Sequence, residues 1–296
     1  MAAVIETAEL KKTYGKHEAV RGLNLSVQAG SVCAFLGQNG AGKSSTIKML
    51  LGMIHPTSGT GRVLNHRIDK EKESLLIRQR VAFVAEDKRL YDYMTVAQII
   101  RFTRSFFPSW NHALESRLLE QFELPPERRI RQLSKGMRTK LALLLGFARG
   151  CELLILDEPT EGLDPVAIED VLQIVVSLAA EGTTIFFSSH QIAEVEQVAD
   201  HVLMIDRGQL VLDAPMDEIA DQYRHIQAVF PEPVEARDFR VPGIEKVRTE
   251  GRTVSLLASH NVDLILEHVR MLHAGSIDVL PISLKELILE KVKARS

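Results

Sequence analysis

Eight residues decide the fold of this chain, and they read Gly37-Gln38-Asn39-Gly40-Ala41-Gly42-Lys43-Ser44. They match the pattern Gly-x-x-x-x-Gly-Lys-Ser/Thr. An apolar run at 31–36 precedes them and predicts a buried strand, and a predicted helix follows from about Gly42 to Leu51. Glycines permit a tight loop whose N–H groups face a phosphate, and a helix N-terminus adds a favourable field. The stretch therefore predicts a nucleotide phosphate site, with Lys43 on the β- and γ-phosphates and Ser44 on Mg²⁺.

A pair of acids, Asp157 and Glu158, ends the apolar run at 153–156. Stability does not explain such a pair, because burying an unpaired carboxylate is costly. Asp157 is placed to hold Mg²⁺, directly or through water, and Glu158 is placed to orient and deprotonate an attacking water. Alone, the pair is also compatible with an acidic surface turn. Together with the phosphate loop it favours hydrolysis of a nucleotide.

Short apolar runs and longer helical patterns alternate through the first 220 or so residues. The runs expected to be buried strands are 31–36, Val81–Ala85, Leu153–Leu156 and Thr184–Phe187. Each is too short for a helix. This order of elements predicts an α/β domain with a largely parallel core sheet. Helical patterns at Met94–Phe107 and Leu114–Phe122 indicate a helical insert at about 87–150.

The chain changes character after about Tyr223. Predicted strands and two predicted helices follow, with paired strands around Glu250-Gly251, and no catalytic cluster is evident. We therefore expect an α/β domain at 1–223 and a small α+β accessory domain at 224–296. Regulation, dimer contact and partner docking all remain open as roles of the accessory domain.

A further helix is predicted to open at Leu133-Ser134-Lys135-Gly136-Met137. Ser134 is a good N-cap residue, and apolar residues follow at helical spacing. Alone, this is an ordinary capped helix. Because it lies a short distance before Asp157, it is also a candidate for a second anion site.

The composition excludes several classes of protein. Hydrophobic residues make up 45% of the chain, which is ordinary for a globular protein. The formal net charge is −3, so the chain lacks the basic excess of nucleic-acid binders, and no nucleic-acid partner is expected. No apolar run reaches the ~18 residues that span a bilayer, and the N-terminus lacks the basic cluster of a secretory signal. The two cysteines, Cys33 and Cys151, lack metal-ligand spacing and are interpreted as core residues in a reducing compartment. A cytoplasmic protein is expected.

Taken together, these motifs resemble those of the ABC ATPases, over roughly residues 4–220. The motifs that occur in the family's order and spacing are 37–44, Leu133–Met137, Asp157-Glu158, Gly162-Leu163-Asp164 and Ser188-Ser189-His190. The resemblance implies an α/β fold, namely a P-loop NTPase core of the ABC ATPase type with a helical subdomain insert and a small C-terminal α+β appendage. It also implies ATP and Mg²⁺ as cofactors.

The resemblance implies roles for single residues. Tyr14 would stack on adenine, and His190 would hydrogen-bond the γ-phosphate and help to place the water. Ser134 and Gly136 would contact the γ-phosphate bound by a second copy, and Asp164 would lie at the seam of this head-to-tail dimer. The implied catalytic residues are Glu158, His190 and Lys43. The implied nucleotide-binding residues are Tyr14, Gly37, Gln38, Asn39, Gly40, Ala41, Gly42, Lys43, Ser44, Ser45, Thr46, Ser134, Gly136 and Asp164. The implied metal-binding residues are Ser44, Asp157 and Glu86.

Two positions depart from the family's common pattern. Glu86 replaces the usual glutamine after the strand at 81–85, and Leu-Ser-Lys-Gly-Met replaces Leu-Ser-Gly-Gly-Gln. Glu86 can still accept from a metal-bound water, but it adds negative charge beside Mg²⁺. At both positions the sequence resembles the branch of ABC ATPases that serves ABC-2 type exporters, which includes some peptide-antibiotic resistance and immunity systems.

The resemblance implies an ATPase on the cytoplasmic side of the cell membrane, bound there through a separate polytopic permease subunit. ATP-driven closure of a dimer would drive transport, and the sequence leaves open the substrate and whether the dimer is homomeric. One alternative is a soluble ABC-type ATPase acting on ribosomes or DNA. The chain has a single ATPase domain without a coiled-coil or zinc insert, and this disfavours that alternative. Another is a non-enzymatic regulatory module, which the competent residues at every catalytic position disfavour.

Overall fold

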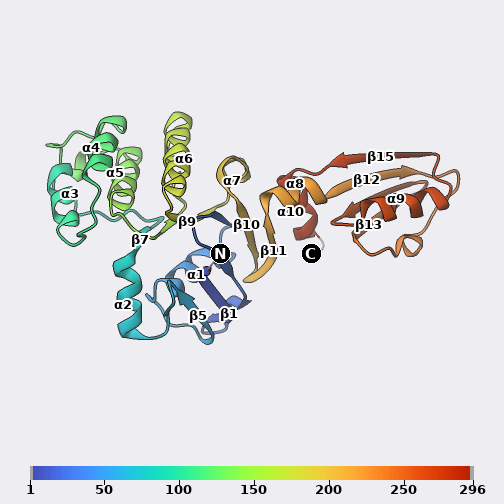
Figure 1. Ribbon diagram of the computed structural model, residues 1–296, viewed down its shortest axis with the longest axis horizontal. Helices are drawn as coiled ribbons and strands as arrows, with labels where there is room; N and C mark the ends of the chain where they lie inside the picture. The colour runs from blue at the N-terminus through green and yellow to red at the C-terminus, as the bar shows by residue number, and fades with distance from the viewer. Residues whose placement is uncertain (1–2, 294–296) are drawn as a thin grey trace. The chain divides into compact units, whose positions relative to one another are not determined.

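The computed structural model describes residues 3–293, which form two compact units that part between Asp213 and Ala214. This point of division lies ten residues before the boundary expected between residues 223 and 224. Helix α8 (Met216–Gln222) therefore falls within the second unit. Figure 1 shows the order of the elements along the chain. No helix within residues 3–293 has the length and apolar composition needed to cross a membrane.

The first unit contains a six-stranded sheet in the order β11-β10-β4-β9-β8-β7. The strands are β4 (Val32–Leu36), β7 (Val81–Val84), β8 (Leu153–Asp157), β9 (Thr184–Ser189), β10 (His201–Asp206) and β11 (Gln209–Pro215). Strands β10, β4, β9, β8 and β7 pair in parallel. Every residue of β4, β8 and β9 is buried, as expected where both faces of a parallel sheet are covered. The prediction of an α/β domain with a largely parallel core is confirmed.

Helices cover both faces of this sheet. Cys33 and Phe35 of β4 pack in one cluster with Ile47 and Leu50 of α1 (Lys43–Leu50). Helices α6 (Pro165–Ala180) and α7 (Ile192–Val198) contact β4 and β9, and Figure 1 shows α6 and α1 on opposite sides of β9. Helix α2 (Glu71–Arg80) lies beside β7. These layers hold the carboxyl ends of the parallel strands in place.

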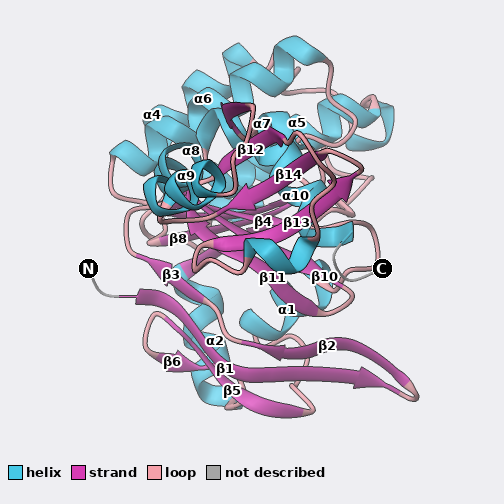
Figure 2. Ribbon diagram, turned by 90° about the vertical axis from the view of Figure 1, so that its right-hand side faces the viewer, coloured by secondary structure: helices cyan, strands magenta, loops and turns pink. Residues whose placement is uncertain are grey.

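A second sheet in this unit was not predicted. It is antiparallel and consists of β1 (Ala3–Tyr14), β2 (His17–Leu23), β3 (Ser26–Gln28), β5 (Ser58–Val63) and β6 (His66–Arg67). Figure 2 shows β1, β2 and β5 side by side. The register of β1 against β2 shifts between Leu10 and Lys11 and again between Lys12 and Thr13. These bulges interrupt the alternation of polar and apolar residues that identifies a strand in a sequence.

The helical insert has the predicted helices with shorter bounds. Helix α3 (Val96–Arg104) was expected from Met94 to Phe107, but Thr95 caps it by accepting from Gln98 N at 3.2 Å. Helix α4 (His112–Gln121) begins two residues earlier than expected, because Asn111 caps it. The short helix η1 (Ile130–Gln132) and α5 (Lys135–Phe147) complete the insert. Side-chain caps, rather than apolar periodicity, set these helix starts.

The second unit is a four-stranded antiparallel sheet with helices. The strand order is β13-β14-β12-β15. Its elements are β12 (Arg224–Val229), η2 (Ala236–Phe239), β13 (Ile244–Glu250), β14 (Thr253–Ala258), α9 (Val262–Met271), β15 (Ser276–Pro281) and α10 (Leu284–Lys293). The β13–β14 hairpin turns at Gly251, where the sequence predicted paired strands. Ile226, Leu256 and Ile265 belong to a core cluster of this unit.

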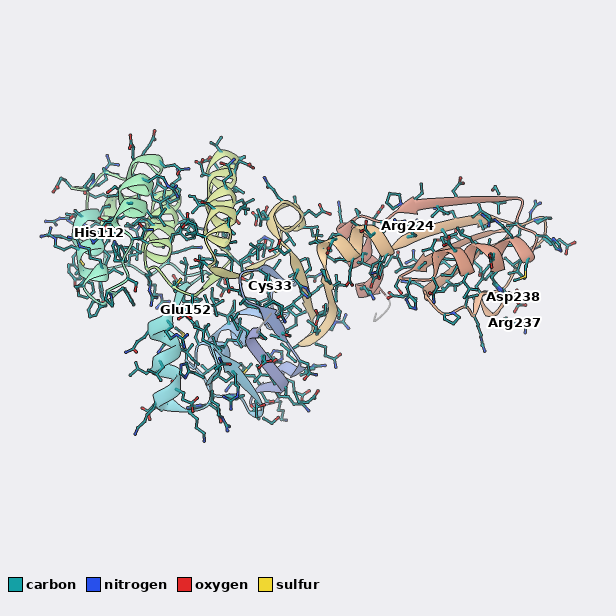
Figure 3. The ribbon with its side chains drawn as sticks, viewed as in Figure 1. Cys33, His112, Glu152, Arg224, Arg237 and Asp238 are labelled. Atoms are coloured by element: carbon teal, nitrogen blue, oxygen red, sulfur yellow. The ribbon has the colours of Figure 1, made fainter. Side chains whose placement is uncertain are left out.

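The two cysteines are both free thiols. Cys33 lies in the buried strand β4 (Figure 3), and Cys151 is partly buried. Burial raises the pKa of each thiol above its ordinary value, which lowers the population of the reactive thiolate. Cys33 belongs to the core as predicted, whereas Cys151 lies at its margin.

Candidate active site

The parallel register brings four loops to one edge of the core sheet. Leu36 at the end of β4 pairs with Ser189, Asp157 pairs with Ser188, and Val84 of β7 pairs with Leu156. The loops after these four strands therefore start side by side, at the carboxyl edge where open α/β sheets bind ligands. They carry the phosphate loop 37–44, Glu86, Glu158 and His190.

Gly42 makes the phosphate loop possible. It caps α1 in a left-handed conformation with φ 113°, and a Cβ built there would lie 2.4 Å from the main-chain oxygen of Ala19. A glycine cap has no side chain to accept the first N–H groups of the helix, so these remain available to an anion. Gly37 is confined likewise, since its Cβ would lie 2.6 Å from the oxygen of Ile205.

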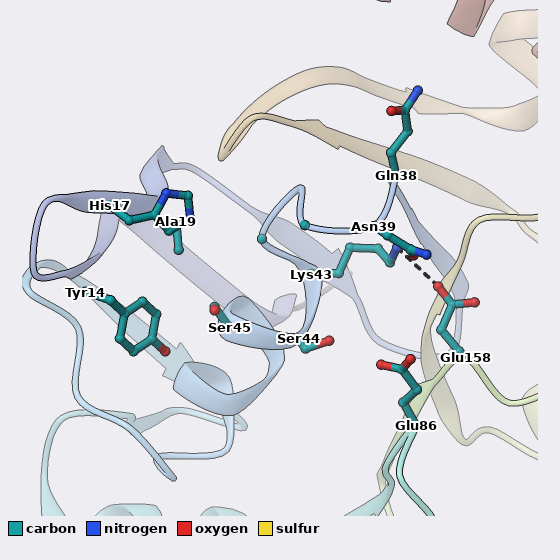
Figure 4. Close-up of a pocket in the computed structure, with 12 residues that line it drawn as sticks. Tyr14, His17, Ala19, Gln38, Asn39, Lys43, Ser44, Ser45, Glu86 and Glu158 are labelled. Carbon is teal, nitrogen blue, oxygen red and sulfur yellow. Dashed lines mark ion pairs between the residues drawn. The ribbon is translucent and has the colours of Figure 1, made fainter.

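A cavity of about 400 Å³ opens at this edge (Figure 4). Its lining residues are Tyr14, His17, Ala19, Gln38, Asn39, Gly40, Gly42, Lys43, Ser44, Ser45, Glu86 and Glu158. Tyr14 is 47% exposed, so its ring is accessible to a flat ligand at one end of the cavity. Figure 4 shows Lys43, Glu158 and Glu86 together at the other end, so the aromatic ring and the charged groups are separated along the cavity.

Glu158 connects the catalytic candidates. Lys43 Nζ lies 3.1 Å from Glu158 Oε1, and His190 Nδ1 lies 2.8 Å from Glu158 Oε2. Lys43 Nζ also donates to the main-chain oxygen of Gly37 at 2.5 Å. Both side chains of the Lys43–Glu158 pair are nearly inaccessible, with 6% and 7% exposed. The Lys43 ammonium therefore compensates the buried Glu158 carboxylate.

Asp157 is not among the residues that line the cavity. It is buried, and Ser188 Oγ donates to Asp157 Oδ1 at 2.5 Å. Ser44 and Glu86 both line the cavity. No group of three or more His, Cys, Asp or Glu side chains within residues 3–293 forms a site for a metal ion. This donor set fits Mg²⁺, which is bound by one or two carboxylates together with waters and substrate phosphates.

The three predicted nucleotide contacts that come after the phosphate loop and α1 in the chain do not line this cavity. Ser134 caps α5 by accepting from Met137 N at 3.2 Å, and Asp164 caps α6 by accepting from Ala167 N at 3.0 Å. The latter hydrogen bond lowers the pKa of Asp164. Gly136 lies in the first turn of α5. Their assignment to the nucleotide of a second copy stays a prediction.

The phosphate-loop residues outside the lining support its backbone. Ala41 is buried, and Thr46 Oγ1 donates to the oxygen of Gly42 at 2.9 Å. Sequence reasoning missed His17 and Ala19, which line the cavity from β2. The β1–β2 turn directly after Tyr14 brings them there, but the sequence analysis did not predict either strand. It also missed Lys88, whose Nζ donates to the main-chain oxygen of Glu158.

Comparison with known proteins identifies the family. A family model for ABC transporters matches residues 20–161. The bacitracin transport ATP-binding protein BcrA of Bacillus licheniformis is 36% identical and aligns with 76% of this chain and 74% of its own. The Nod factor export ATP-binding protein I of Paraburkholderia xenovorans is 32% identical and aligns with 97% and 96%.

The fold agrees with this result. A solved structure of an ATP-binding subunit of an ABC transporter matches with a TM-score of 0.67 at 28% identity, covering 74% of this chain and 92% of its own. The match to the transporter family model includes the lining residues of the nucleotide cavity from Gln38 to Glu158. The chain therefore belongs to the ATP-binding, ATP-hydrolysing subunits of the ABC transporter family.

Proposed function

We propose that this ATPase powers an exporter of the ABC-2 type, through ATP-driven closure of two copies coupled to a separate membrane subunit. The observation that carries the catalytic part is the contact of Lys43, Glu158 and His190 at the carboxyl edge of the sheet. The names of the two relatives, which refer to bacitracin transport and Nod factor export, support the transport part.

The proposed reaction begins with an exchange of partners at Lys43. The phosphates of ATP take the Lys43 ammonium, and Tyr14 stacks on the adenine. The Glu158 carboxylate, released from Lys43, then accepts a proton from the water that attacks the γ-phosphorus. His190, which contacts Glu158, donates to the γ-phosphate. The bond to the β-phosphate oxygen breaks, and ADP and phosphate form.

Mg²⁺ would be held by Ser44, Glu86 and, directly or through water, Asp157. When bound, the ion neutralises charge on the β- and γ-phosphates. Ser44 presents its hydroxyl to the cavity at the first turn of α1, and Glu86 faces the cavity from the loop after β7. The hydrogen bond from Ser188 Oγ fixes the position of the Asp157 carboxylate.

The start of α5 supports the dimer proposal. The Lys135 side chain is 71% exposed and forms an ion pair with Glu161 at 2.9 Å. Ser134 fixes the first turn of the helix, and this N-terminus is favourable for an anion. Because these residues are outside the cavity of their own chain, a second copy is the source of the phosphate that we assign to them.

An exposed aromatic cluster on the insert supports a separate membrane partner. Its members are Tyr91, Tyr93, Phe102 and Phe106, which are 51%, 69%, 41% and 62% exposed. Their rings contact one another with centroids 5.1–5.8 Å apart. Contiguous exposed apolar surface of this kind marks interaction sites. We assign this cluster to the contact with the permease.

Substitution of Glu158 tests the catalytic proposal. Glu158→Gln keeps the size of the side chain but removes the base, so we expect ATP turnover to fall by at least about 100-fold while ATP binding persists. Phosphate release and calorimetric titration measure the two quantities. Glu152→Gln, which changes an exposed acid paired with Arg80, is the matched control and should retain turnover. Near-normal hydrolysis by Glu158→Gln would remove Glu158 from the role of base.

Co-purification tests the transport proposal. The tagged chain would be recovered from its native cell after the membranes are solubilised in mild detergent. We expect a polytopic membrane protein in near-equal amount, and introduction of a negative charge into the aromatic cluster by Phe106→Glu should reduce its recovery. Recovery with ribosomes or nucleic acid alone would keep the ATPase and reject the transporter.

A further inference from the structure

Lys88 is a half-buried cation that the proposed mechanism does not yet use. It lies two residues after Glu86, in the segment that leads from β7 into the helical insert. Its Nζ donates to the main-chain oxygen of Glu158 at 3.0 Å. The lysine therefore reaches from the segment after β7 to the backbone of the residue that we propose as the base.

The backbone of Glu158 has an unfavourable conformation that its hydrogen bonds stabilise. Its φ is 48°, a left-handed conformation that costs free energy for any residue with a Cβ. The Glu158 N–H donates to Ser188 Oγ at 3.1 Å, and the Glu158 oxygen accepts from Lys88. The residue is thus held on both sides of its Cα, by Ser188 at the end of β9 and by Lys88 in the segment after β7.

The contacts of the Glu158 carboxylate are of a different kind. Oε1 lies against Lys43 and Oε2 against His190. Since ATP takes Lys43 in the proposed reaction, the carboxylate loses one of these partners when the substrate binds. The two backbone contacts do not involve phosphate-binding groups, so they persist and keep the carboxylate at its place.

The carboxylates around Lys88 favour its charged form. Burial lowers the pKa of the Lys88 ammonium, and the carboxylates of Glu161, Glu86 and Asp157 oppose this shift, whereas Lys135 adds to it. Glu86 is the acid that replaces the glutamine common in this family, and it lines the cavity next to Glu158. Lys88 places a positive charge near this additional negative charge.

We propose that Lys88 is a positioning residue for hydrolysis: it fixes the Glu158 backbone, so that the carboxylate stays aligned on the attacking water after Lys43 has turned to ATP. This inference rests on the proposed role of Glu158 as the base. Lys88 itself needs no contact with the nucleotide. Its loss should therefore change the chemical step rather than substrate binding.

The test compares three variants of the full chain. Lys88→Met removes the charge and the donor at similar length, and Lys88→Arg keeps both. Arg89→Met is the matched control, because Arg89 is 88% exposed and pairs only with the neighbouring Asp87 in the contacts of the described residues. Steady-state kinetics give kcat and KM, calorimetry gives the ATP affinity, and thermal unfolding checks the fold.

We expect kcat of Lys88→Met to fall about tenfold, because a small misplacement of a catalytic group lowers the rate strongly, while KM and ATP affinity change less than about twofold. Lys88→Arg should recover part of kcat, and Arg89→Met should match the unmodified chain. A normal kcat for Lys88→Met would overturn the inference. So would a parallel loss of ATP affinity, or an arginine variant no better than methionine.

Failure of the inference is separable from failure of the proposed function. If Glu158→Gln retains turnover, Glu158 is not the base, and the position of its carboxylate no longer matters. If Glu158→Gln is inactive and Lys88→Met is normal, the base stands and only Lys88 loses its role. Should Lys88→Met unfold, Lys88→Gln takes its place, with the same expected separation of kcat from KM.

Discussion

At the residue scale, the ion pair of Lys43 and Glu158 joins the residue that we assign to the phosphates with the one that we propose as the base. Two groups with different tasks in the reaction neutralise each other inside a nearly inaccessible part of the site. A buried ion pair contributes little net stability, but removal of one partner leaves an uncompensated charge. In our proposal, the pair keeps the base and the phosphate-binding cation in place until ATP takes Lys43.

Lys43→Ala should weaken ATP binding by at least about tenfold, because it removes a charge-assisted contact to the phosphates. It should also destabilise the nucleotide-free protein, since Glu158 then lacks its cation. Calorimetric titration with ATP and thermal unfolding measure the two effects. Lys48→Ala, an exposed lysine on the same helix, is the control and should change neither. Unchanged ATP affinity in Lys43→Ala would contradict the assignment.

At the element scale, the loop between β4 and α1 depends on backbone space. Gly42→Ala should displace the loop, because its Cβ would lie 2.4 Å from the oxygen of Ala19 at a φ of 113°. Gly182 is the matched control: its φ is also positive, at 97°, but a Cβ there has nothing within 4 Å. Both alanine variants carry backbone strain of about 1 kcal/mol or more. Only Gly42→Ala should lose ATP binding as well, and ATP binding equal to that of Gly182→Ala would disprove this account.

The elements also show what the sequence can predict. Strands β4, β8 and β9 are buried on both faces, so they appear as short continuous apolar runs and were predicted. The long strand β1 has bulges and a mixed pattern, so the antiparallel sheet was not predicted. The start of α3 was misplaced because the Thr95 cap, rather than apolar periodicity, decides where the helix begins.

The same distinction holds for the site. Residues that belong to a contiguous motif, such as Lys43 and Glu158, were predicted from the sequence. The residue types and their spacing within the motif already indicate phosphate binding and hydrolysis. His17 and Lys88 were not predicted, since their roles follow from a β-turn and from a contact across 70 positions of the chain. Contacts of this kind depend on the tertiary fold, and no local pattern records them.

At the scale of the whole molecule, the two units have separate cores. Ile226, Leu256 and Ile265 pack within the second unit, whereas the cluster around Phe35 and Ile47 belongs to the first. Units with their own hydrophobic cores need not unfold together. Nucleotide binds residues of the first unit alone in our proposal, since every residue that lines the cavity precedes Asp213.

We therefore expect two transitions in the calorimetric unfolding of the full chain, of which Mg²⁺ and ATP shift only one. The Glu158→Gln variant should be used, so that ATP persists during heating. A ligand that binds only the native state stabilises it by about 2.7 kcal/mol when its concentration is 100-fold above Kd. The unshifted transition should be the one that Ile265→Ala lowers, because this substitution leaves a cavity in the second core. A single transition that ATP shifts as a whole would instead show that the accessory unit unfolds together with the ATPase, and its role would then have to be sought in the stability of the nucleotide site.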